Sequence, residues 1–328
     1  MKVIKTILCL VLALLMVAVL AAAAWVGLFF YHTKPANIIP YPDNGFMTSD
    51  TMVVAHRSGG GIVPEETMAA FRYCVESGLD IDIFEFDLHL TADNVPVLLH
   101  DAELDRTSDS EEVFGVSGVT AAEKTYEELR QLNMGAKYIN EAGETPYAGL
   151  TGEDVPDDIR IATLDEVLDY LSASGDFRYI IEIKDAGERG FQAVDLLYET
   201  AAQRNLLDKI IFASFHDDIM AYVAAAYPDT CRGASTSQAV EFYFRALLND
   251  KNYVPTFNTV QPPYGNFKSS YGANYTLARV INYAHERGIA FQYWTINKEE
   301  DMKYLLRLGV DGITTDYPDR LSALKQGK

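Results

Sequence analysis

Short stretches of alternating apolar and polar residues recur along the chain, and segments with a helical period lie between them. Alternation with a period of two is typical of β-strands, whereas apolar residues spaced three and four apart indicate amphipathic helices. A repeated strand-helix order predicts an α/β fold, and eight such units predict a (β/α)₈ TIM barrel. The eight predicted strands are 51–56, 82–90, 178–184, 209–215, 231–236, 257–263, 289–297 and 309–316.

The second predicted strand is followed by additional sequence. VPVLLH (95–100) comes directly after the turn residues TADN, so we expect it to return as a hairpin beside the second strand. Residues 107–161 are too long for an ordinary loop, and we expect them to form an insertion over the barrel mouth with one short helix near residues 126–132. GxGxxG is absent, which disfavours a dinucleotide-binding sheet.

The N-terminal residues 7–30 contain no charged side chain. About 20 apolar residues suffice to cross a bilayer, so a single membrane-spanning helix is predicted. Lys2 and Lys5 precede it, which predicts that the N-terminus lies in the cytoplasm and the remainder of the chain outside it. The alternative is a signal peptide cleaved near the small residues 21–24. The expected organisation is a stub and anchor at 1–31, a Pro-containing tether at 32–50 and a barrel at 51–328.

Composition narrows the function classes. The 328 residues are 48% hydrophobic, enough for a sizeable core, and carry a formal net charge of -20. A surface this acidic argues against a nucleic-acid partner, which requires fields of Lys and Arg. The three cysteines show no metal-binding spacing, so cysteine chemistry is not expected.

Acidic residues interrupt two strands that are otherwise apolar. In DIFEFDLHL (82–90), Glu85 and Asp87 point to one face, while the phenylalanines point to the other. Glu182 and Lys184 repeat this arrangement in the next barrel strand. Carboxylates that converge inside a barrel repel one another and need a cation. Oxygen ligands without Cys or His suit Mg²⁺ or Ca²⁺, so the three acids predict a site for one divalent cation.

Two histidines end predicted strands at the same barrel edge. His56 is followed by Arg57, and His100 is followed by Asp101. Histidine titrates near neutrality and can serve as general acid or base, while Arg57 and Lys184 can bind an anionic group. Together with a metal, these residues indicate phosphoryl-ester chemistry. His89 is expected to face solvent, and the histidines placed outside the site are His32, His216 and His285.

The stretch AHRSGGGIVPEETMAAFRYCVESGLDIDIFEFDLHLTADNVPVLLHDAELDRTSD resembles the opening of the glycerophosphodiester phosphodiesterase family. That family shows an ordered pattern of HRG, PENT, E-x-D, T-x-D, P-V-x-x-HD and L-x-R-T. IIEIK, FASF, QYWTIN and GVDGITTDYPD continue the resemblance, which spans residues 52–324. The resemblance implies a (β/α)₈ barrel with an insertion after the second strand, which agrees with the strand pattern.

The resemblance also implies residue roles. His56 and His100 would be the acid/base pair, Trp294 would line the pocket, and Glu65 would support the first loop. Two departures stand in that loop: Ser58 replaces the glycine of HRG, and Glu66 replaces the Asn of PENT. We expect these changes to alter loop geometry or substrate preference without abolishing activity. The implied metal ligands are Glu85, Asp87 and Glu182, and the implied phosphate contacts are Arg57 and Lys184.

The expected reaction is metal-dependent hydrolysis of a glycerophosphodiester to glycerol 3-phosphate and an alcohol. The substrate is expected to be a small glycerophosphodiester or a cell-envelope polyglycerol phosphate. Two alternatives remain: a related barrel phosphodiesterase acting on intact phospholipid, like a phospholipase C or D, and a membrane-anchored binding protein on an inactive barrel. The intact set of predicted ligands and histidines disfavours the inactive barrel. The head group and the separate roles of the two histidines stay open.

Overall fold

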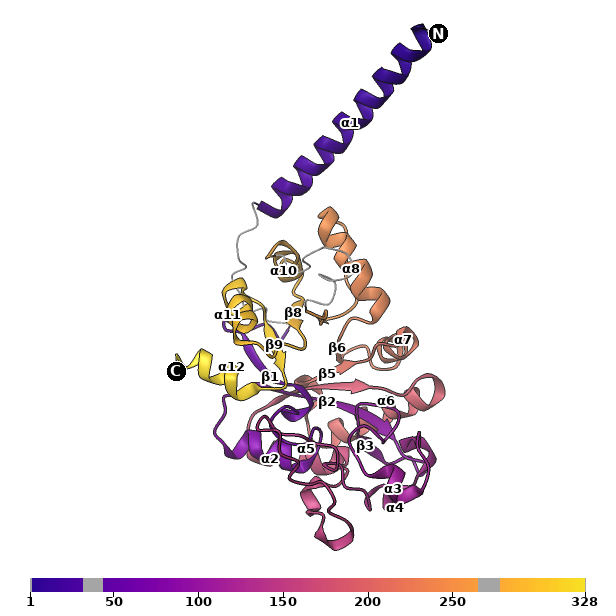
Figure 1. Ribbon diagram of the computed structural model, residues 1–328, viewed down its shortest axis with the longest axis vertical. Coiled ribbons are helices and arrows are strands. Elements are labelled where there is room, and N and C mark those ends of the chain that lie inside the picture. Colours follow the sequence, from indigo (N-terminus) through magenta and orange to yellow (C-terminus); the bar gives the residue numbers. More distant parts are fainter. Residues whose placement is uncertain (1, 32–43, 265–277, 328) are drawn as a thin grey trace.

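Eight parallel strands form a barrel at the centre of the computed structural model, which describes residues 2–31, 44–264 and 278–327 (Figure 1). Neighbouring strands follow the order β6-β5-β4-β2-β1-β9-β8-β7, and a parallel bridge between Gly233 and Thr259 joins the two ends of this sheet. The predicted TIM barrel is confirmed. The barrel strands are β1 (Met52–Ala55), β2 (Ile83–Leu90), β4 (Arg178–Ile183), β5 (Ile210–Ala213), β6 (Cys231–Arg232), β7 (Thr259–Val260), β8 (Ala290–Tyr293) and β9 (Gly312–Thr315).

Helices surround the strands and cover their outer faces (Figure 1). The strands β6 and β7 are shorter than the sequence pattern predicted, because the backbone leaves the sheet soon after each strand begins. The covering helices are α2 (Met68–Glu76), α5 (Leu164–Ser174), α6 (Gly187–Gln203), α7 (Asp217–Ala226), α8 (Thr236–Leu248), α10 (Ala278–His285), α11 (Glu299–Leu308) and α12 (Pro318–Lys325).

The outer face of β2 shows how strands and helices pack. Phe84 and Phe86 are fully buried and point outward, as their alternation with the acids predicted. Phe71 of α2 packs against both rings, with centroid distances of 5.7 Å and 5.6 Å. Phe177 meets Phe84 edge to face at 5.0 Å. Such aromatic contacts add to the hydrophobic burial that holds the helical layer on the barrel.

The inner face of the barrel is apolar at the amino ends of the strands. Val54, Ile83 and Ile180 belong to a buried cluster there, and Phe46 and Met47 close it from below, with 1% and 3% of their surfaces exposed. These two residues belong to the range predicted as tether, so its last part packs into the barrel. Residues 32–43 of the predicted tether lie outside the described part of the chain.

The expected hairpin after β2 is confirmed, since β3 (Pro96–Leu98) pairs antiparallel with β2. The insertion that follows builds its own small core from residues such as Leu104, Leu129 and Ile161. It also reaches the loop after β1, where the Tyr138 hydroxyl donates to the carbonyl of Ile62 at 2.5 Å. The helices of the insertion are α3 (Ser110–Phe114) and α4 (Tyr126–Leu129). Among all described residues, 3₁₀ turns are formed by 56–58, 121–123, 152–154, 157–159 and 207–209.

The N-terminal helix α1 (Lys2–Tyr31) extends away from the barrel (Figure 1). The side chains of residues 5–25 of this helix are exposed. The 21-residue segment Lys5–Trp25 has a mean hydropathy of 3.1, long and apolar enough to cross a membrane. A signal sequence has the same length and composition. The helix is therefore a candidate for either role.

Candidate active site

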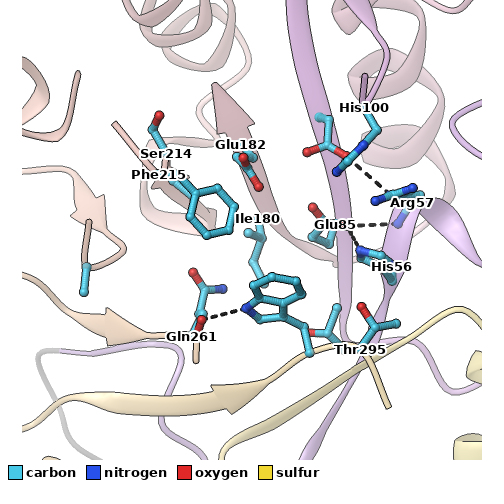
Figure 2. A pocket seen from close by; sticks show the side chains of 15 residues that line it. His56, Arg57, Glu85, His100, Ile180, Glu182, Ser214, Phe215, Gln261 and Thr295 are labelled. Atoms are coloured by element: carbon cyan, nitrogen blue, oxygen red, sulfur yellow. Dashed lines mark hydrogen bonds and ion pairs between the residues drawn. The ribbon is translucent and has the colours of Figure 1, made fainter. Parts of the chain in front are cut away.

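A pocket opens at the carboxyl ends of the barrel strands (Figure 2). Apart from His100, its lining comes from β2, β4, β9, the last residue of β5, and the segments that follow β1, β5, β6, β7 and β8. None of the described lining residues belongs to the insertion 107–161, which packs instead beside β3 and the loop after β1. The pocket is thus formed by the barrel itself together with His100, which follows the β2–β3 hairpin.

Three carboxylates meet on one side of this pocket. Asp87 of β2 and Glu182 of β4 are direct partners in the parallel ladder, so their side chains point the same way, and Glu85 lies two residues before Asp87. One oxygen of each lies within 4.8 Å of the others. Glu85 and Asp87 are buried, at 7% and 1% exposure. The three predicted ligands are therefore brought together as one acidic cluster.

Two basic side chains partly neutralise the acidic cluster. Lys184 Nζ lies 2.9 Å from Glu182 Oε1 and 3.4 Å from Asp87 Oδ1. Arg57 Nε lies 3.7 Å from Asp87 Oδ2. Both oxygens of Asp87 are nevertheless buried without a hydrogen-bond donor among the described residues, and Arg57 Nε is buried without an acceptor among them. These unused polar atoms are what a site for a cation and an anionic ligand requires.

Burial shapes the protonation of the acids. It raises the pKa of Glu85 and of Glu182 to about 7, and the charge of Asp87 adds to both shifts. Burial opposes ionisation of Asp87 as well, but the charges of Lys184, His100 and Arg57 outweigh it and lower the pKa of Asp87. The cluster thus holds one firmly ionised carboxylate and two that exchange protons near neutrality.

His56 is held by an acid from the opposite end of the chain. Its Nδ1 lies 2.5 Å from Asp316 Oδ1, while its Nε2 faces the cluster, 3.9 Å from Glu85 Oε2. Asn297 fixes Asp316 by donating from its side-chain amide to Oδ2 at 2.6 Å. Burial lowers the pKa of His56, but the hydrogen bond to Asp316 and the charge of Glu85 outweigh it, so the pKa is raised.

His100 has a carboxylate partner too, but it is less buried than His56. Its Nδ1 lies 2.6 Å from Asp101 Oδ1, and Asp101 is in turn paired with Arg106. The pKa of His100 is lowered, first by burial and then by the charges of Arg57 and Lys184. A carboxylate on Nδ1 fixes the ring orientation and leaves Nε2 for proton transfer.

Glu65 connects the two basic residues of the pocket rim. It accepts a hydrogen bond from Arg57 at 3.1 Å and also pairs with Arg106, 2.5 Å from its Nη2. A continuous series of ion pairs therefore runs from Arg57 through Glu65, Arg106 and Asp101 to His100. The expectation that Glu65 supports the first loop agrees with these contacts.

The loop after β1 carries both sequence departures and is conformationally strained. Arg57, Ser58 and Glu66 all have positive φ angles, of 46°, 60° and 58°. Such conformations cost energy for residues other than glycine and cluster at functional sites. Gly61 is required by close approach, since a Cβ there would lie 2.6 Å from the ring of Tyr317. The loop is thus pressed against the segment that follows β9.

Glu66 lies beneath the acidic cluster. It is 4% exposed, and its Oε1 accepts the backbone N–H of Asp87 at 2.7 Å. Burial and the neighbouring charges of Asp87 and Glu65 raise the pKa of Glu66 well above its usual range, which favours its protonated form. The Glu in place of Asn therefore supports the backbone of a proposed ligand instead of adding a full negative charge.

Two aromatic side chains, Phe215 and Trp294, form part of the pocket wall. Trp294 lines the pocket and donates from Nε1 to the carbonyl of Gln261 at 2.7 Å. Phe215 meets Trp294 edge to face, with ring centroids 5.8 Å apart. This wall can contact an apolar part of a ligand whose charged part faces the acids and bases.

The interpretation of His89 was wrong. It is 6% exposed, and its Nδ1 lies 2.7 Å from Asp185 Oδ1. Asp185 also accepts the backbone N–H of Leu90, so a buried carboxylate at the end of β4 holds the imidazole in place. His216 and His285 lie outside the pocket as expected, and His32 falls outside the described residues.

Sequence reasoning missed several residues of the pocket. Asp316 and Asn297 had no predicted role, although they are the last residues of the predicted strands 309–316 and 289–297. Polar residues at the carboxyl ends of barrel strands were the available signal. Ser214, Phe215 and Gln261 also line the pocket, and their short sequence contexts gave no comparable indication.

Two histidines can act as general acid and general base, and an acidic cluster can bind a metal ion. A TIM barrel with both is suited to the hydrolysis of a phosphoric ester. The model of the glycerophosphoryl diester phosphodiesterase family matches residues 56–320, most of the chain. The chain belongs to this family and is therefore an enzyme, a phosphoric diester hydrolase that acts on glycerophosphodiesters.

Individual relatives agree with this assignment. The glycerophosphodiester phosphodiesterase of Bacillus altitudinis is 28% identical over 279 residues, which cover 84% of this chain and 98% of the relative. Among solved structures, a phosphodiesterase from Oleispira antarctica in complex with the product sn-glycerol-3-phosphate aligns with a TM-score of 0.62 at 22% identity, covering 84% of this chain and 96% of that one. A glycerophosphodiester phosphodiesterase from Agrobacterium tumefaciens aligns with a TM-score of 0.61 at 18% identity, covering 83% and 100%. At these identities the solved structures support the fold.

Proposed function

We propose that the enzyme hydrolyses glycerophosphodiesters to glycerol 3-phosphate and an alcohol, using one divalent cation and two histidines. The observation that carries this proposal is the convergence of Glu85, Asp87 and Glu182, with one oxygen of each within 4.8 Å of the others, in the pocket that also contains His56 and His100. The sn-glycerol-3-phosphate bound to the Oleispira antarctica relative gives independent support for the product.

The acidic cluster fits a divalent cation by its chemistry. Its donors are all oxygens, which Ca²⁺ and Mg²⁺ prefer, and Asp87 offers two buried oxygens without a hydrogen-bond donor among the described residues. When bound, the cation would polarise a phosphate oxygen and lower the pKa of a substrate hydroxyl. Lys184, now beside Glu182 and Asp87, would be free to turn toward the phosphate once the acids bind a metal.

Arg57 and Lys184 bind the phosphate in this proposal. Arg57 Nε is buried with no hydrogen-bond partner among the described residues, and Lys184 lies on the opposite side of Asp87. A guanidinium and an ammonium that approach from two sides neutralise the two sides of a phosphodiester. Trp294 then contacts the glycerol or the leaving alcohol across the pocket.

The two histidines move the protons. One imidazole Nε2 accepts the proton of a glycerol hydroxyl as its oxygen bonds to phosphorus, and the other donates a proton to the alcohol oxygen as its bond to phosphorus breaks. Water then opens the resulting cyclic phosphate with the roles reversed, which restores both protonation states. Asp316 and Asp101 keep Nδ1 of each ring occupied throughout.

A second candidate is hydrolysis of intact phospholipid by the same site. The apolar candidate span in α1 favours a lipid-derived or cell-envelope substrate, since it would keep the enzyme at a membrane. A polyglycerol phosphate contains the same glycerophosphodiester linkage and needs no acyl chains in the pocket. We favour deacylated substrates because the pocket lining combines many polar groups with a limited aromatic wall.

The test is an activity screen of the full-length enzyme in detergent. Glycerophosphocholine, polyglycerol phosphate and phosphatidylcholine are compared with Ca²⁺, with Mg²⁺ and with a chelator. We expect release of glycerol 3-phosphate from a deacylated diester, and loss of activity with the chelator. Preferred cleavage of phosphatidylcholine would establish the second candidate. No hydrolysis of any diester and no cation binding would indicate an inactive barrel.

We further propose the predicted domain organisation, with residues 1–31 as stub and single-pass anchor, 32–50 as tether and 51–328 as extracytoplasmic catalytic domain. The charge-free apolar segment behind Lys2 and Lys5 supports this orientation. Mass spectrometry of the N-terminus after expression distinguishes an anchor from a cleaved signal sequence, after which the chain would begin near residues 21–24. A periplasmic reporter fused after Lys328 tests the orientation.

A further inference from the structure

The outer face of α8 carries an apolar stripe that no described segment covers. Val240, Phe244 and Leu248 are spaced four residues apart and therefore lie on one side of the helix, with exposed fractions of 53%, 59% and 71%. Val254, in the loop that leads to β7, is 81% exposed. We call these four residues the α8 patch. Exposed apolar residues gathered in this way are characteristic of interaction surfaces.

The α8 patch extends along the side of the barrel. The first turn of α8 lies at the pocket end, where the Thr236 hydroxyl donates to the carbonyl of Phe215 at 3.0 Å. Phe215 is itself 50% exposed and lines the pocket. The helix then runs antiparallel to β6, so Leu248 and Val254 lie toward the opposite end of the barrel. The α8 patch therefore extends from near the pocket end of the barrel toward its far end.

The far end of the patch lies where the N-terminal segment enters the barrel. The side-chain amide of Asn44 donates to the carbonyl of Asn258 at 2.8 Å, and Asn258 ends the loop that contains Val254. Residues 32–43 connect α1 to Asn44. Twelve residues span at most about 40 Å even when fully extended. If α1 is the membrane anchor, Asn44, which lies beside the loop at the far end of the α8 patch, is held within about that distance of the bilayer.

The charged residues around the patch are compensated locally. Arg245, on the same helix, pairs with Glu241 at 3.0 Å and with Asp250 at 2.8 Å, and Lys251 pairs with Glu286 at 3.1 Å. Although the whole chain carries a formal net charge of -20, this side therefore presents little unpaired negative charge. An anionic lipid surface would repel the acidic remainder of the domain more than the patch.

We propose that the α8 patch is the surface by which the catalytic domain contacts the lipid bilayer to which α1 anchors it. This inference rests on the proposed anchor. Because the tether holds the domain close to the bilayer, its binding to lipid is an intramolecular event. A patch of four side chains is then sufficient, although the same patch on an untethered domain would bind lipid too weakly. When α8 lies against the lipid, the pocket rim at Phe215 lies beside the membrane surface.

Tryptophan quenching in vesicles tests this contact. Full-length protein is reconstituted into phosphatidylethanolamine–phosphatidylglycerol vesicles, with and without brominated acyl chains, which quench nearby indoles. The reporter is Leu248→Trp in a Trp25→Phe background. The matched control is Ile139→Trp in the same background, because Ile139 is 62% exposed and belongs to the insertion. We expect brominated lipid to quench the Leu248 reporter about twofold or more beyond the Ile139 control.

A second variant verifies that the patch causes the contact. Adding Val240→Ser and Phe244→Ser to the Leu248 reporter should lower its quenching to that of the control, while hydrolysis of a soluble diester stays unchanged. Equal quenching of the two reporters would overturn the proposal. So would sedimentation showing that the patch is covered by a second copy. A Trp294→Phe variant, whose remaining indole is Trp25, reports on the anchor: unquenched Trp25 would overturn the anchor and the docking together, whereas quenched Trp25 with equal reporters overturns docking alone.

Discussion

The interior of the barrel is apolar at one end and charged at the other. At the amino ends of the strands, Phe46 and Met47 fill the interior and join an apolar cluster with no charged member. At the carboxyl ends, Glu85, Asp87 and Glu182 are brought together in the same interior with Lys184 between two of them. The same strands thus supply a stable core at one end and concentrated charge at the other.

This difference shows how the fold tolerates an unfavourable site. Burying carboxylates side by side costs free energy, and the positive φ angles of Arg57, Ser58 and Glu66 add to that cost. The apolar end and the aromatic layer outside β2 offset it. Substitutions at the pocket end are therefore expected to change chemistry, and substitutions at the other end to change stability.

The largest effect is expected from the histidines at the pocket end. His56→Ala or His100→Ala should lower kcat by about a hundredfold or more, because each removes a proton-transfer group. Steady-state kinetics on a deacylated diester, with melting temperature as a folding check, measures this. His216→Ala is the matched control, since His216 is exposed and lies outside the pocket lining. Near-normal turnover in both site variants would refute the assignment.

The acidic cluster should determine cation binding. Asp87→Asn removes the carboxylate whose pKa is lowered and should weaken Ca²⁺ or Mg²⁺ binding by about tenfold or more. Isothermal titration calorimetry measures the affinity, and activity should be recovered only in part at high cation concentration. Asp93→Asn serves as control, because Asp93 lies in the exposed turn before β3. Unchanged affinity in Asp87→Asn would place the cation elsewhere.

The other end of the barrel should respond in the opposite way. Phe46→Ala deletes a ring that is 1% exposed and should destabilise the domain by about 3–5 kcal/mol, while kcat on the remaining folded enzyme stays close to that of the parent. Denaturant unfolding gives the free energy. Val116→Ala, at a position 58% exposed, should change it by less than about 0.5 kcal/mol. A large loss of kcat in Phe46→Ala would show that the two ends are coupled.

The smallest expected effect is a pH dependence of the cation-free enzyme. The pKa of Glu85 and Glu182 is about 7 in the folded state, above the usual carboxyl range, so the folded state binds more protons than the unfolded state between about pH 4.5 and 7. Stability should therefore fall as pH rises through this window. His56, whose pKa is also raised, acts in the same direction.

Thermal unfolding in chelator at pH 5 and pH 8 measures this dependence. We expect a decrease of a few °C that is smaller in the double variant Glu85→Gln/Glu182→Gln, which cannot ionise at these positions. Saturating Ca²⁺ or Mg²⁺ should oppose the decrease at pH 8, because it binds the ionised carboxylates. An identical pH response of the parent and the double variant would mean that other groups cause it.

The sequence predicted correctly those structural features that depend on a repeating pattern of neighbouring residues. The alternation in residues 82–90 placed Phe84 and Phe86 outside and Glu85 and Asp87 inside, and the repeat of strands and helices predicted the barrel. Residues at the ends of strands share one edge in such a fold, which is why His56 and His100 could be placed beside the acids.

Contacts between distant segments could not be read in this way. The pairing of His56 with Asp316 joins residues 260 positions apart, and no local pattern records it. His89 was misplaced because its partner, Asp185, stands beyond the end of another strand and compensates for its burial. The insertion was predicted from its length, but its position beside β3 depends on an apolar cluster formed only after folding.

The attachment of the N-terminal segment has a mechanical consequence. Asn44 donates to the carbonyls of Asn258 and Gly288, at 2.8 Å and 2.9 Å, and Phe46 is enclosed directly above it. A pull on the segment that leads to α1 would load these hydrogen bonds and the enclosed ring before it reached any side chain of the pocket. If α1 anchors the enzyme in a membrane, as proposed, bending and thickness fluctuations of that membrane would load this attachment first, and the histidines and acids would keep their spacing.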